Sequence, residues 1–134
     1  MKRLVVAGAA LGLAACSPAP PVWQVVAVYT APDTPGDVPD RANVSIDGSK
    51  LTGSTGCGKV EGDVTVTEDT LTVNEISFAD TAGCEGAARY THDQLASLVV
   101  PEATFRINNA SDTEKVLTLE GDDVNEPSIR VMML

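Results

Sequence analysis

Three cysteines and one histidine are the residues of this 134-residue chain whose side chains could carry redox, nucleophilic or metal chemistry. Cys57 lies in the glycine-rich stretch Gly53–Gly58, and Cys84 ends the turn-like stretch Thr81–Cys84. Glycines at such density indicate backbone that needs positive φ or close approach to another segment. Neither cysteine has a partner at the close Cys-x-x-Cys spacing of redox and zinc sites. We therefore favour a structural disulfide between Cys57 and Cys84, with free thiols and metal ligation as alternatives.

His92 and an acidic loop are the other candidates for site chemistry. The sequence places His92 in the first turn of a helix, where we expect an exposed side chain rather than a member of a nucleophilic triad. On this basis, His92→Ala is predicted to change function and stability little. The loop Gly121–Glu126 offers oxygen ligands but lacks the order of an EF-hand, so a solvated loop is favoured over a calcium site. We assign no catalytic residue, no metal site and no cofactor.

The first sixteen residues have the features of an export signal that ends in a lipidated cysteine. The basic start Met1–Arg3 is followed by the apolar run Leu4–Ala15, which is shorter than the roughly 20 residues of a membrane span and is typical of a secretory signal. Leu13-Ala14-Ala15-Cys16 resembles the lipobox of bacterial lipoproteins, in which the cysteine is acylated and becomes the N-terminus. The chain is thus expected to divide into a signal peptide (1–15), a tether (16–21) and one folded domain (22–134).

The charge of the chain limits its partners. The formal net charge is −10, and removal of Lys2 and Arg3 with the signal would change it to −12. Such a surface repels phosphate backbones and anionic lipids, so we expect no nucleic-acid binding and membrane contact only through lipid on Cys16. The expected location is the extracytoplasmic face of a bacterial cell membrane. Outside the cytoplasm, the two remaining cysteines form an even pair, which again favours a disulfide.

Alternating apolar and polar residues indicate strands through most of the expected domain. Both faces of Val22–Tyr29 are apolar, which predicts a strand buried on two sides, with Trp23 and Tyr29 on one face. Asp47-Gly48 is a typical hairpin turn. The alternation slips by one residue at Asn74-Glu75, which predicts a β-bulge. We expect an α+β fold: a mostly antiparallel curved sheet of about seven strands with one short helix.

The helix is predicted around Tyr90–Leu95. Thr91 and Gln94 have the spacing of a capping box, while Tyr90 and Leu95 have that of a hydrophobic staple. This predicts a helix whose N-cap is Thr91 and which ends before Pro101. A start near Gly86 is the alternative, because Ala87 and Ala88 also favour helix.

The order of these features resembles the META domain, the family of small HslJ-like envelope lipoproteins. The matching segments, in chain order between Val22 and Leu134, are Val22-Trp23-Gln24-Val25-Val26, Gly53-Ser54-Thr55-Gly56-Cys57-Gly58, Gly62-Asp63-Val64, Thr81-Ala82-Gly83-Cys84 and Leu117-Thr118-Leu119. Gly58 occupies a position at which the family usually has asparagine. The resemblance implies a curved antiparallel sheet with one or two helices, an envelope location and no agreed enzymatic activity.

Three functional hypotheses follow from the sequence. The leading one is a lipid-anchored, non-enzymatic envelope protein, with a binding, envelope-maintenance or stress role toward an unknown envelope protein or ligand. The alternative is an inhibitor of a secreted or envelope hydrolase, acting through an exposed loop at Thr30–Arg41 or Gly121–Pro127. An enzyme is the third, but it would need convergent titratable groups that the sequence does not place together.

Overall fold

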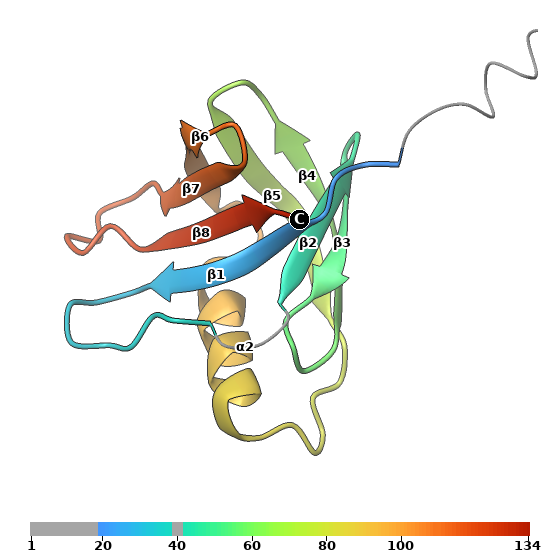
Figure 1. Cartoon of the computed structure of the whole chain (residues 1–134), viewed down its shortest axis with the longest axis vertical. Coiled ribbons are helices and arrows are strands. Elements are labelled where there is room, and N and C mark those ends of the chain that lie inside the picture. The colour runs from blue at the N-terminus through green and yellow to red at the C-terminus, as the bar shows by residue number, and fades with distance from the viewer. Residues whose placement is uncertain (1–18, 39–41) are drawn as a thin grey trace, which may run out of the picture.

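The computed structural model describes residues 19–38 and 42–134, which form an eight-stranded barrel with one helix (Figure 1). The predicted signal peptide (1–15) and Cys16 lie outside the described residues. The elements, in chain order, are β1 (Trp23–Tyr29), β2 (Asn43–Asp47), β3 (Lys50–Ser54), β4 (Lys59–Val66), β5 (Thr70–Phe78), α2 (Gly86–Leu98), β6 (Thr104–Ser111), β7 (Glu114–Leu119) and β8 (Ser128–Met133). No helix of the described residues is long and apolar enough to cross a membrane.

The sheet is closed, which corrects the predicted α+β fold with a curved sheet of about seven strands. Each strand pairs antiparallel with the next in the chain, and β8 returns to pair with β1, for example at Val25 and Val131. The single helix covers one end of the barrel instead of forming a layer of its own (Figure 1). No local pattern signals this closure, because it depends on hydrogen bonds between the first and last strands of the domain.

The interior of the barrel is lined by apolar side chains that alternate with outward-facing residues along the strands. The buried members include Val25, Val64, Val73, Phe105 and Ile129. In β8 the burial alternates regularly, with Ile129 and Val131 inside and Arg130 outside. The period-2 pattern read from the sequence therefore identifies the inner face of most strands.

Strand β1 contains a bulge that explains its apolar residues on both faces. Its register against β8 shifts between Val25 and Ala27, so Val25 and Val28 both face the interior and are buried. Trp23 and Tyr29 consequently do not share a face, contrary to the prediction. Trp23 lines the barrel interior, whereas Tyr29 is exposed.

The predicted bulge in β5 is confirmed. Asp63 of β4 pairs with Glu75, and the next residue, Val64, pairs with Val73, so Asn74 is the extra residue. The predicted hairpin at Asp47-Gly48 is also confirmed, since Asp47 pairs with Lys50 and Gly48 has φ +64°. A two-residue loop with positive φ suits the twist of the flanking strands.

The helix begins earlier than the capping box predicted. It runs from Gly86 to Leu98 with Glu85 as N-cap, as in the alternative start near Gly86. Thr91 lies inside the helix and is buried instead of capping it. Burial of Thr91, Gln94, Leu95 and Leu98 follows the i, i+3, i+4, i+7 spacing of an amphipathic helix, so this face packs against the barrel.

The two ends of the barrel differ. At one end, which we call the floor, α2 covers the barrel (Figure 1), and its His92 contacts Thr55, which follows β3, and Phe78, which ends β5. At the other end, which we call the mouth, the chain enters β1 at Trp23 and the three hairpins β2–β3, β4–β5 and β6–β7 turn back. The mouth and the entering chain therefore lie on the same side of the protein.

Candidate functional site

The barrel encloses a cavity of about 410 Å³. This volume falls within the usual range of small-molecule sites in proteins. Most of the wall is formed by apolar side chains. They come from all eight strands, from Leu95 of α2 and from Val99, which follows that helix. These are Trp23, Val25, Val44, Ile46, Leu51, Val60, Val66, Leu71, Val73, Phe78, Leu95, Val99, Phe105, Ile107, Leu117, Ile129 and Val131.

The floor of the cavity is held together by specific side-chain contacts. Leu95 and Val99 at the end of α2 close the barrel from below. Beside them, Thr55 Oγ1 and His92 Nδ1 form a buried hydrogen bond of 2.7 Å. The edge of the Phe78 ring meets the imidazole, with the ring centroids 5.5 Å apart. These contacts join α2 to the ends of β3 and β5.

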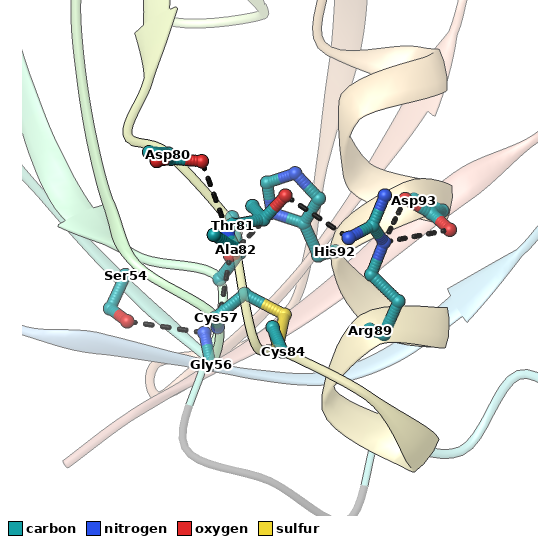
Figure 2. The surroundings of a disulfide bond; sticks show 11 residues. Ser54, Gly56, Cys57, Asp80, Thr81, Ala82, Cys84, Arg89, His92 and Asp93 are labelled. Atoms are coloured by element: carbon teal, nitrogen blue, oxygen red, sulfur yellow. Dashed lines mark hydrogen bonds and ion pairs between the residues drawn. A yellow bond between two sulfur atoms is a disulfide. The ribbon is translucent and has the colours of Figure 1, made fainter.

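A disulfide fixes the same end of the molecule. Cys57 and Cys84 are bonded, with their Cα atoms 5.6 Å apart (Figure 2), as predicted from the sequence. Each cysteine lies in a turn: Thr55 N–H donates to the Gly58 carbonyl, and Cys84 N–H donates to the Thr81 carbonyl. The bond thereby links the β3–β4 connection to the segment that leads into α2.

The glycine stretch around Cys57 has the backbone role predicted for it. A Cβ at Gly53 would stand 2.1 Å from the Asn43 carbonyl oxygen, so β2 and β3 approach too closely for any side chain there. Gly56 has φ +97°, which favours glycine in the turn before Cys57. The stretch is therefore explained by folding constraints.

His92 lies elsewhere than predicted. It is 8% exposed, because the earlier start of α2 turns it toward the barrel instead of placing it in an exposed first turn. Its described partners are Thr55 and Phe78, neither of which makes it a catalytic base. The arrangement assigns His92 to the floor as a structural residue.

The loops proposed for an inhibitor differ in their exposure. Within 30–38, the Pro35 carbonyl accepts hydrogen bonds from the Tyr90 hydroxyl and the Gln94 amide, so this part lies against α2. In the loop that follows β7, Val124 is 92% exposed.

Residues 19–38 and 42–134 contain no group of three or more His, Cys, Asp or Glu that could hold a metal ion, the acidic loop included.

Sequence reasoning missed the cavity and one charged residue in its wall. Lys115 lines the cavity near the mouth and is half-buried. A signal existed, since Lys115, Leu117 and Leu119 alternate along β7, and the two leucines identify that face as the inner one. The space inside the barrel could not be predicted from the sequence, because it depends both on closure of the sheet and on the number of strands.

Comparison with known proteins supports the fold and goes no further. No protein-family model and no curated protein matches the chain. The NMR structure of a protein from Burkholderia xenovorans is similar, with a TM-score of 0.64, 14% identity, and coverage of 88% of this chain and 92% of that one. A second NMR structure has a TM-score of 0.54 and 10% identity over 84% of this chain and 88% of the other. At these identities the likeness concerns the fold alone.

Proposed function

We propose that this protein is a lipid-anchored, non-enzymatic protein of the cell envelope whose barrel binds a small apolar molecule. The observation that carries the proposal is the cavity of about 410 Å³ with a mainly apolar wall. Burial of aliphatic or aromatic surface in such a cavity is favourable by about 25 cal/mol per Å². The envelope location and the META-like character rest on the sequence features described above.

The position of the mouth fits an anchored binding protein. Cys16 precedes Trp23 by seven residues, and an extended chain spans at most about 3.5 Å per residue. Lipid on Cys16 would therefore hold the mouth within about 25 Å of the membrane surface. A ligand partitioned into that membrane would need to travel only a short distance through water.

Apolar binding is testable because Trp23 is the chain's one tryptophan and lines the cavity. Titration with the neutral probe N-phenylnaphthylamine is expected to increase probe fluorescence and to change Trp23 emission in a saturable way. Val73→Phe adds bulk at a fully buried wall position and is expected to weaken binding at least tenfold. Val124→Phe adds the same bulk at an exposed loop position and should bind as the parent does.

The outcome that contradicts the proposal is equally direct. If the folded parent protein neither alters the probe's fluorescence nor shows a changed Trp23 spectrum, the cavity does not take apolar ligands. The same conclusion would follow if Val73→Phe, with melting temperature and circular dichroism like those of the parent, bound the probe unchanged.

The anchor is tested separately. Cys16→Ala removes the thiol that the lipobox-like segment would present for acylation. The variant is expected to leave the membrane fraction or to accumulate as an unprocessed precursor, because without acyl chains this acidic protein has little affinity for the bilayer. Fractionation and intact mass are the measurements. A variant that stays membrane-bound at the mature size would show that Cys16 is not the anchor.

A further inference from the structure

Lys115 is a basic residue on the inner face of a mainly apolar barrel. It lies on β7 beside Val131 of β8 and Asn109 of β6, and its side chain lines the cavity. Val131 is buried and belongs to the same wall. A charged ammonium group adds no apolar packing to such a wall. An inward lysine is therefore not explained by the need to fill the barrel.

The ammonium group of Lys115 is oriented by two neutral partners. Its Nζ donates a hydrogen bond to Asn109 Oδ1 and lies 5.3 Å from the centroid of the Trp23 ring. The three ion pairs found among residues 19–38 and 42–134 do not include Lys115. An ammonium has three donors, and the Asn109 bond uses one of them. The group thus retains capacity for an anion at the mouth.

The other charged residue in the cavity wall is Glu68, which belongs to the exposed tip of the β4–β5 hairpin. Further carboxylates at the mouth, including Asp47, Asp69 and Asp112, are also exposed. Repulsion between exposed charges and an incoming anion is screened over about 8 Å at physiological salt. A head group in direct contact with the Lys115 ammonium lies well within this screening distance, so Lys115 determines which head group is favoured.

We propose that the barrel binds a single-chain aliphatic molecule with an anionic head group, and that Lys115 binds the head. The inference rests on the proposed apolar-ligand function and names its ligand class. The aliphatic chain lies between the walls formed by residues such as Leu71, Val73 and Phe105. The head group stays at the mouth, where Lys115 donates a charge-assisted hydrogen bond and Trp23 covers the first part of the chain. The closed floor limits the chain length that fits.

The test compares ligands that share a chain and differ in the head group. Dodecanoate, dodecanol and dodecyltrimethylammonium are titrated below their aggregation concentrations against the folded, delipidated protein, with Trp23 emission as the readout. Dodecanoate is expected to bind at least tenfold more tightly than dodecanol, since hydrogen bonds to charged groups are about twice as strong as neutral ones. Each methylene removed from the alkyl chain of the carboxylate ligand should weaken its binding about fourfold, as expected for a chain buried in the barrel.

Three substitutions separate the role of Lys115 from a general effect of charge. Lys115→Met is expected to make dodecanoate and dodecanol bind alike, within about threefold. Lys115→Arg should preserve the preference for the carboxylate. Lys50→Met removes an exposed lysine at the mouth end of β3 and should leave the preference intact. Because these readouts are ratios between ligands, a modest change in stability does not imitate the result.

Failure of this inference is distinguishable from failure of the proposed function. If the parent binds dodecanol and dodecanoate equally, or prefers the cationic ligand, the anionic head group is refuted while apolar binding stands. Retention of the carboxylate preference in Lys115→Met would show that another residue binds the head. If none of the three ligands binds and N-phenylnaphthylamine does not either, the proposed function fails.

Discussion

Loss of the disulfide between Cys57 and Cys84 is expected to lower the free energy of unfolding by about 3.5 kcal/mol. The two cysteines are separated by 27 positions, and this value is the entropy that closure of such a loop removes from the unfolded chain. Domains of this size are commonly stable by only 5–15 kcal/mol. The double substitution Cys57→Ser/Cys84→Ser should therefore melt about 10–20 °C below the parent protein.

Calorimetry with and without reductant measures this effect and supplies its own control. Reductant should lower the melting temperature of the parent toward that of the double variant and should leave the double variant unchanged. Intact mass should fall by two hydrogens when the reduced parent is oxidised. A parent protein whose melting temperature is insensitive to complete reduction would show that the bond adds nothing to the floor of the barrel.

Replacing His92 by Ala is expected to destabilise the protein by about 2–4 kcal/mol. The imidazole is buried and forms a 2.7 Å hydrogen bond with Thr55, whose side chain is also buried. Its removal leaves the Thr55 hydroxyl without this partner and opens a space beside Phe78. This expectation replaces the nearly neutral effect predicted from the sequence, which assumed an exposed residue.

A double-mutant cycle isolates the hydrogen bond from the loss of packing. Thr55→Val removes the other partner with little change of shape, so the pair of substitutions should cost less than the sum of the single ones. Urea unfolding of the four proteins gives the coupling energy. Strict additivity would show that the Thr55–His92 contact contributes no energy of its own, and a stability loss below about 0.5 kcal/mol for His92→Ala would contradict the buried placement.

Local chemistry explains which elements were predictable. The hairpin at Asp47-Gly48 and the bulge at Asn74 both follow from backbone preferences and period-2 alternation within a few residues. The Cys57–Cys84 bond followed from cysteine count and from two glycine-bearing turns. Each of these inferences uses contacts close in sequence or a covalent constraint, so one sequence suffices.

The features that were not predictable depend on packing between distant segments. Thr91 and Gln94 have the spacing of a capping box, but burial against the barrel placed Thr91 inside a longer helix. The bulge between Val25 and Ala27 has no local signal, because a strand that is apolar on both faces tolerates either register. Placing Lys115 in a cavity wall required knowing that the sheet closes.

Closure of the sheet also limits how another protein can recognise this one. Each of the eight strands has a hydrogen-bonded neighbour on both sides, so none is an edge strand of an open sheet. Partners that recruit a target by adding a strand to its sheet need such an edge, and aggregation between edges needs it as well. Where a strand is paired on both sides, recognition by β-augmentation is therefore disfavoured. A partner protein would there bind side-chain surfaces, such as the hairpin tips, the loop carrying Val124 or the exposed side of α2. Under the proposed lipid anchoring, copies crowded on one membrane surface would remain separate for the same reason.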